Sequence, residues 1–195
     1  LPGLPALLQV REVVARVGTT YETALRERIL EPLALERTAL LPTAPVATPY
    51  FVHPHHDGVR VEPDMAVTES TGAAGWLWST TADLARWADF LCTGADGVLA
   101  RSTLDEMARV QTMVDEVGWG VGWGLGLELM RRGDRVLAGH VGAMPGFLAA
   151  VFVQRSERIG AAVLMNTGAG ASPDALALDL AEGALDLLPS VVETW

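Results

Sequence analysis

The stretch GHVGAMPGF, residues 139–147, places a single histidine, His140, between two glycines and then adds Gly142, Pro145 and Gly146. A stretch so rich in glycine and proline normally marks a loop, yet the apolar run VLA precedes it and FLAAVFV follows it. Glycine lets a ligand or another backbone approach closely, and an imidazole changes charge near neutral pH. The stretch therefore indicates a polar site between two strands, although a histidine that caps a tight strand-to-loop turn explains the same residues.

Strands are predicted on both sides of this stretch. After Val117 the segment GWGVGWGLGLEL alternates glycine with large apolar residues, which predicts a strand packed closely against other backbone. The segments RVLAGH, FLAAVFVQ and RIGAAVLMN predict three further strands, and the short charged segment RSER predicts a hairpin between the last two. From Ser172 to Leu188 the apolar spacing becomes helical, with Pro173 in the first turn.

The first half of the chain predicts helices and one long irregular stretch. Residues 4–17 carry apolar side chains at helical spacing, and Thr20 opens a second helix that ends at Pro32. A proline-rich stretch over residues 42–71 predicts an extended excursion over the surface.

Two further helices are predicted from their first turns. Thr80 and Asp83 fit a capping box for a helix that ends at Gly94, because each side chain can satisfy a backbone N–H that the helix leaves unpaired. Ser102 and Asp105 repeat this spacing and predict a second, short helix.

The order of these elements predicts an α+β fold, in which helices flank an antiparallel sheet meander. Residues 1–116 are expected to be mostly helices and loops. Residues 117–195 are expected to form antiparallel strands followed by the terminal helix. We expect one domain over residues 1–195.

Composition and charge exclude several functions. The chain has 195 residues and a formal net charge of -10, and all 14 of its positively charged side chains are arginines. A nucleic-acid partner requires clustered basic residues, so none is expected. No apolar run approaches the ~20 residues needed to cross a bilayer, so we expect no membrane-spanning segment. The single cysteine, Cys92, excludes an intrachain disulfide and is expected to be a small buried side chain.

Four segments together resemble one enzyme family. GWLWSTTADLARWADFL, GHVGAMPGF, AAVLMNTG and YETALRERILEPLALERT are similar, in their order and spacing, to the C-terminal half of the serine β-lactamase-like hydrolases. That family includes class C β-lactamases, penicillin-binding DD-peptidases and related esterases. The resemblance covers almost the whole chain and implies a partial domain, the C-terminal part of the β-lactamase-like (DD-peptidase) fold.

The resemblance also implies three site residues. In that family a strand beside the nucleophile carries Lys-Thr-Gly or, in many esterase-like members, His-X-Gly, and His140-Val141-Gly142 matches the second form. It implies that His140 is a polar donor facing the pocket and that Gly142 gives clearance to the substrate. The backbone N–H of Ala143 would be one donor of the oxyanion hole.

Other motifs of the family are absent from the sequence. None of the six serines is followed three residues later by a basic residue, so no Ser-X-X-Lys exists. The position expected for Tyr-X-Asn holds Leu1-Pro2-Gly3, and the chain starts with leucine rather than methionine. We therefore expect the native start to be missing and this chain to be inactive alone. Whether it is an enzyme stays open, and the sequence indicates no localisation.

The resemblance implies hydrolysis of ester, amide or lactam carbonyls through an acyl-enzyme, without a cofactor. The expected partners are a small-molecule or peptide-like carbonyl substrate and a missing N-terminal half or an oligomeric partner, which would cover the open edge of the sheet. The alternative is a degenerate, non-catalytic binding or interaction module.

Two further features of the sequence have simpler explanations than a ligand site. The run His53-Pro54-His55-His56-Asp57 favours a solvated loop over a Zn²⁺ or Cu²⁺ site, so no metal is expected. The six tryptophans allow carbohydrate stacking, but most are expected in the core, with one or two near the pocket mouth.

Overall fold

The computed structural model describes residues 16, 18–53, 55, 57–63, 75–115 and 117–187. The helix predicted over residues 4–17 lies almost entirely outside the described residues. The described helices and strands follow the chain in this order: α2 (Tyr21–Leu25), η1 (Arg26–Leu30), β1 (Tyr50–Val52), β2 (Val59–Val61), α3 (Thr81–Thr93), α4 (Arg101–Met107), β3 (Thr112–Met113), β4 (Val121–Trp123), β5 (Glu128–Arg132), β6 (Arg135–Met144), β7 (Phe147–Gln154), β8 (Ile159–Met165) and α5 (Pro173–Asp186). None of the helices in these ranges has the length and apolar character of a membrane span.

The predicted α+β fold with an antiparallel meander is confirmed. Strands β3 to β8 form one six-stranded sheet in which every strand lies next to its neighbour in sequence, and all five pairs are antiparallel. The RSER hairpin and the terminal helix are also where the sequence predicts them. The prediction of one strand over GWGVGWGLGLEL is wrong, because Gly124 donates its N–H to the Leu127 carbonyl and the chain turns between β4 and β5.

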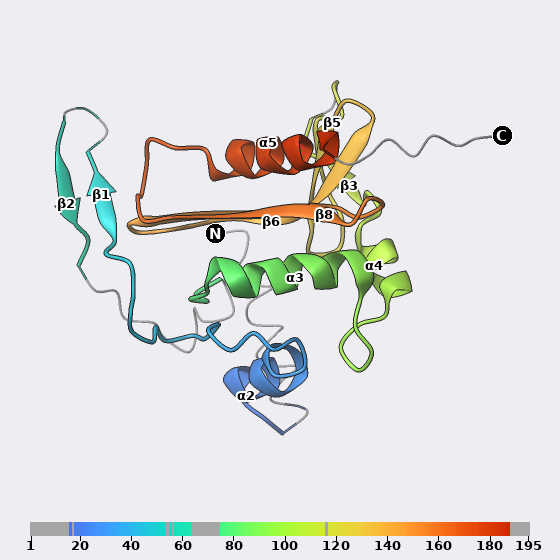
Figure 1. The fold of residues 1–195 in the computed structure, drawn as a ribbon, viewed down its shortest axis with the longest axis horizontal. Helices are drawn as coiled ribbons and strands as arrows, with labels where there is room; N and C mark the ends of the chain where they lie inside the picture. Colours follow the sequence, from blue (N-terminus) through green and yellow to red (C-terminus); the bar gives the residue numbers. More distant parts are fainter. Residues whose placement is uncertain are drawn as a thin grey trace.

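Helices cover both faces of the sheet. Figure 1 shows α5 on one side of β6 and β8 and α3 on the other side. Side chains alternate between the two faces along each strand: Leu137 and Phe152 pack with α5, and their neighbours Ala138 and Val153 pack with α3 and α4. The strands around residue 140 are therefore held from both sides.

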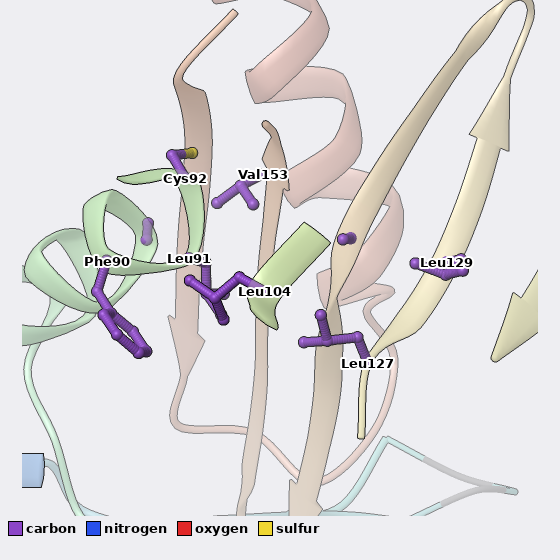
Figure 2. Close-up of a cluster of buried hydrophobic side chains, with 9 residues drawn as sticks. Phe90, Leu91, Cys92, Leu104, Leu127, Leu129 and Val153 are labelled. Atoms are coloured by element: carbon purple, nitrogen blue, oxygen red, sulfur yellow. The ribbon is translucent and has the colours of Figure 1, made fainter. Parts of the chain in front are cut away.

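Figure 2 shows the core on the α3 side, where Phe90, Leu91 and Leu104 from the two helices meet Leu129 and Val153 from the sheet. Leu104 and Leu129 are almost completely buried. Burying each of these leucines contributes roughly 1.5–3 kcal/mol. Cys92 is buried in the same cluster, as predicted, and burial raises the pKa of its thiol.

One arginine joins the β7–β8 turn to both helices of this layer. Arg155 donates from Nε to the Leu91 carbonyl at 2.7 Å and from Nη1 to the Leu104 carbonyl at 2.9 Å, and its Nη2 lies 2.8 Å from Asp105. These carbonyls belong to the C-terminal turns of α3 and α4, and the Leu104 carbonyl also accepts the Ala108 N–H at 3.0 Å. The guanidinium therefore fixes the helices to the sheet.

The Thr80 half of the predicted capping box is confirmed, whereas the Asp83 carboxylate binds groups outside the first turn of the helix. The Thr80 hydroxyl accepts the Asp83 N–H at 3.2 Å. The Asp83 carboxylate, only 2% exposed, accepts the Arg37 N–H and the Thr38 hydroxyl, both at 2.8 Å, and pairs with Arg86. It thereby ties α3 to a loop more than forty residues earlier in the chain.

The corresponding prediction for Ser102 is wrong. Helix α4 begins at Arg101, its N-cap is Ala100, and no side chain caps it. Because the helix starts before Ser102, this serine already lies within the first turn. The backbone pairing of Ala95 with Leu99 fixes where the chain enters the helix.

We expect Asp83→Ala to lower the free energy of unfolding by about 3 kcal/mol, because it leaves the Arg37 N–H and the Thr38 hydroxyl, both in part-buried hydrogen bonds, without their acceptor. The matched control is Asp89→Ala in the same helix. Asp89 is 68% exposed and lies 3.5 Å from Arg158, so its loss should change stability by at most ~0.5 kcal/mol. Urea unfolding followed by circular dichroism measures both values, and equal losses would contradict the role given to Asp83.

Candidate active site

Strand β6 is longer than the strand that pairs with it on one side. Its register with β5 runs from Arg135, opposite Arg132, to Gly139, opposite Glu128, and stops there. Its register with β7 continues to Met144, opposite Phe147. Residues 140–144 therefore have β7 on one side and, among the described strands, no partner on the other. We call this segment the free edge of β6.

The hairpin geometry decides which backbone groups face the free edge. Each hairpin at the ends of β6 has a two-residue turn, and the residues flanking such a turn exchange hydrogen bonds. Along β6 the even-numbered residues therefore bond to β7 and the odd-numbered ones to β5. Beyond Gly139 the N–H and C=O groups of Val141 and Ala143 point to the side where β5 has ended. The predicted oxyanion donor, the Ala143 N–H, thus faces the open side of the strand.

The three site residues predicted from the sequence lie together on this segment. His140, Gly142 and Ala143 are all exposed. Among the described residues, a Cβ built at Gly142 would meet only the Ala149 Cβ, at 3.7 Å, so the face of the strand at Gly142 is open. A Cβ at Gly139 would lie 1.9 Å from the Val151 carbonyl oxygen. The first glycine of the motif is therefore required for packing, whereas Gly142 leaves room for a ligand.

Two contacts hold the His140 imidazole. Its Nδ1 lies 2.5 Å from the carbonyl oxygen of Val141, and its ring centroid lies 5.4 Å from that of Trp123, with the ring planes tilted by 59°. The histidine is thus neither buried in apolar packing nor the cap of a turn. The sequence predicts most tryptophans in the core and does not indicate Trp123 as a neighbour of His140, because only the register of β4, β5 and β6 brings the two together.

The end of β6 is anchored by its turn. Gly146 has a φ of +77°, and a Cβ there would lie 2.4 Å from the Pro49 Cβ, so only glycine fits. Phe147 packs edge-to-face on Trp78, with centroids 5.1 Å apart. Asn166 donates from its side chain to the Thr48 carbonyl at 3.0 Å. These contacts hold the free edge in place from the segments before α3 and after β8.

A buried carboxyl group lies where the free edge begins. Glu128 is the first residue of β5, stands opposite Gly139 and is 9% exposed. Its Oε2 is buried and makes no hydrogen bond within the described residues. Such an unpaired oxygen is unusual in a folded protein and is concentrated at functional sites.

Other candidate sites are less well supported. A surface hollow of about 490 Å³ lies beside α3 and another of about 430 Å³ beside α2 and η1, and neither includes a residue of β6. Within the described ranges no group of three or more His, Cys, Asp or Glu side chains is placed to hold a metal ion. The His55 N–H donates to Nδ1 of His53 at 3.1 Å, and His56 lies outside the described residues.

A family model with the description Beta-lactamase matches residues 6–185. The chain belongs to the Beta-lactamase family. This confirms the resemblance seen in the sequence and the β-lactamase-like fold, whose members include serine hydrolases.

Solved structures of this family superpose well on the chain. The octameric penicillin-binding protein homologue of Pyrococcus abyssi is 23% identical, with a TM-score of 0.76 over 87% of this chain and 39% of its own length. The D-amino acid amidase of Ochrobactrum anthropi in complex with D-phenylalanine is 25% identical, with a TM-score of 0.71 over 93% of this chain and 56% of its own. The Beta-lactamase/D-alanine carboxypeptidase of Pseudomonas syringae is 15% identical, with a TM-score of 0.69 over 94% of this chain and 58% of its own.

The chain therefore spans between 39% and 58% of the length of these three structures. No curated protein matches it.

The two glycines of the motif should respond differently to alanine. We expect Gly139→Ala to lower the free energy of unfolding by about 3 kcal/mol or more, because the added methyl group overlaps backbone atoms of β7 that cannot move without breaking the ladder. Gly142→Ala should change it by less than ~1 kcal/mol, because its methyl group meets only an ordinary contact. Thermal unfolding of the two variants measures the difference. A Gly142→Ala protein as unstable as Gly139→Ala would contradict the conclusion that the space at Gly142 is open.

Proposed function

We propose that this chain supplies the oxyanion-binding wall of a serine hydrolase that cleaves ester, amide or lactam carbonyls through an acyl-enzyme. One observation carries the proposal: β6 extends past β5, so that the backbone N–H of the exposed Ala143, beside His140 and Gly142, faces a side on which no described strand pairs with it. Membership of the Beta-lactamase family supports it.

The free edge can hold an extended substrate as an additional strand. The Ala143 N–H donates to the substrate carbonyl oxygen, and the Ala143 carbonyl accepts an N–H from an amide substrate. As the carbonyl carbon becomes tetrahedral, its oxygen gains negative charge, and the fixed N–H dipole stabilises this charge in the transition state. Loss of one such donor typically raises the barrier by ~3–4 kcal/mol. Gly142 contributes by leaving the face of the strand beside Ala143 free of a side chain, which gives clearance to the substrate.

We infer that the attacking serine comes from outside these 195 residues, because no serine of the sequence begins a Ser-X-X-Lys motif and the described serines have other partners or positions. Ser79 shares a hydrogen bond with Thr38, Ser156 donates to Glu157, and Ser172 donates to Asp174. Ser102 lies in the first turn of α4. None of them is paired with a base, which a serine nucleophile needs.

The second part of the enzyme has a surface on which to pack. Strand β8 is an edge strand of the sheet, and no described strand pairs with its outer side. None of its seven residues, Ile159–Met165, is charged. Leu164 beside this edge is 41% exposed, and Leu180 on α5 is 50% exposed. A long apolar edge favours pairing with another strand. We propose that an N-terminal half, or a further subunit as in the octameric relative, covers it.

The test removes only the proposed donor. In the protein expressed with the coding sequence that precedes residue 1 in its gene, we expect Ala143→Pro to reduce acylation by a fluorescent ester or penicillin probe about 100- to 1,000-fold. Proline has no N–H, and it is tolerated where a strand's N–H faces outward. Ala143→Ser keeps the N–H and is the matched control, with acylation expected within about threefold of the parent protein.

Equal acylation of Ala143→Pro and Ala143→Ser would overturn the proposed donor. A folded parent protein that binds the probes without forming any covalent adduct would favour the non-catalytic binding module instead.

A further inference from the structure

The contact between Trp123 and His140 rests on a strand that is held at both ends. At its start, the N–H groups of Gly120 and Val121 donate to the carboxylate of Asp115 and keep the pKa of that group below its ordinary value. At its end, a Cβ at Gly124 would lie 2.0 Å from the Met107 carbonyl oxygen. The backbone that carries Trp123 is therefore fixed by its close approach to the end of α4.

The register places this fixed tryptophan where the free edge begins. Trp123 stands opposite Glu128, which stands opposite Gly139, the residue before His140. The Trp123 side chain is half-buried, so one part of the indole packs into the protein while its ring contacts the exposed imidazole. An aromatic ring on a fixed backbone restricts the orientations open to its neighbour.

The other contact of His140 determines its tautomer. A carbonyl oxygen only accepts hydrogen bonds, so the Nδ1 that lies against the Val141 carbonyl must carry a proton. In the neutral ring the second nitrogen, Nε2, then has no proton and can only accept. Within the described part of the chain Nε2 makes no hydrogen bond. It is therefore the ring nitrogen left to meet a ligand.

We propose that Trp123 is a positioning residue for His140: it holds the imidazole over the Val141 carbonyl, so that Nδ1 carries the proton and Nε2 is presented to the substrate as an acceptor. This inference rests on the proposed function for its consequence, but the ring geometry can be tested without any activity. It changes the role expected from the sequence, because a neutral His140 accepts a hydrogen bond here and donates one only when protonated. The contact also separates the two residues whose backbone groups face the free edge. The Val141 carbonyl accepts the imidazole N–H, so Ala143 is the one of the two whose N–H and C=O are both available to a ligand.

The experiment is a long-range ¹H–¹⁵N correlation spectrum of the full 195-residue chain at pH 8.5, where an ordinary imidazole is neutral. His140→Gln assigns the His140 signals among the four histidines of the sequence. We expect Nδ1 of His140 to have the chemical shift of a protonated nitrogen and Nε2 that of an unprotonated one. In Trp123→Leu we expect this pattern to shift toward the Nε2-protonated form, and in Trp123→Phe we expect it to be retained.

Trp119→Leu is the matched control, because Trp119 lies on the same segment but stacks on Arg131, at 5.1 Å, rather than on His140. It should leave the His140 tautomer unchanged. Should Trp123→Leu fail to fold, nuclear Overhauser contacts between the indole and the His140 ring in the unmodified protein decide the question. Absence of those contacts, a proton on Nε2 in the unmodified protein, or equal spectra for Trp123→Leu and Trp119→Leu would each overturn the inference. These results do not depend on the acylation assay, so the positioning role and the proposed function fail separately.

Discussion

The unequal length of two neighbouring strands is the constraint on which the candidate site depends. β6 has ten residues and β5 has five, so the ladder between them closes only over the first half of β6. A strand edge with unpaired N–H and C=O groups is a cost to a folded protein, because another chain can pair with it. Most proteins protect such an edge with charges, prolines or a covering segment. Here the open segment has glycine and histidine instead, which leaves its backbone groups accessible. The same opening that costs stability creates a place where an extended ligand can pair with the sheet.

An open edge is useful in catalysis only if it is rigid, because a donor must be in place before charge develops. The core supplies this rigidity from both faces: Phe152 and Leu137 pack beneath α5, and Val153 packs beneath α3 and α4, in one cluster with Leu104 of α4. Gly139 belongs to this packing rather than to the site. The first half of β6 is therefore a structural strand, and the second half, from His140 onward, is the part that can meet a substrate.

The local patterns of the sequence predicted the meander, the RSER hairpin and the terminal helix, because each depends on spacing over a few residues. The turn inside GWGVGWGLGLEL was not predictable in this way, since alternating glycines continue through it without a break in the pattern. Long-range contacts were missed for a different reason. Asp83 fits a helix cap, and nothing near it indicates that its carboxylate binds Arg37 and Thr38. Trp123 likewise contacts His140 only because of a register across three strands.

Glu128 and the free edge have the same origin. The chain enters β5 at Glu128, so β5 ends its cover of β6 there, and the carboxyl group is buried at that point with one oxygen unpaired. Leaving a buried acceptor without a donor costs about 1–3 kcal/mol. An apolar residue at this position would avoid that cost. The sequence therefore retains a polar group that lowers the stability of the fold, next to Trp123 and His140. Exceptions to the rule that buried polar atoms are hydrogen-bonded are expected at functional sites. The unpaired Glu128 oxygen and the proposed oxyanion donor thus lie at the same end of the β5–β6 pair, where the shorter strand stops and the longer one continues.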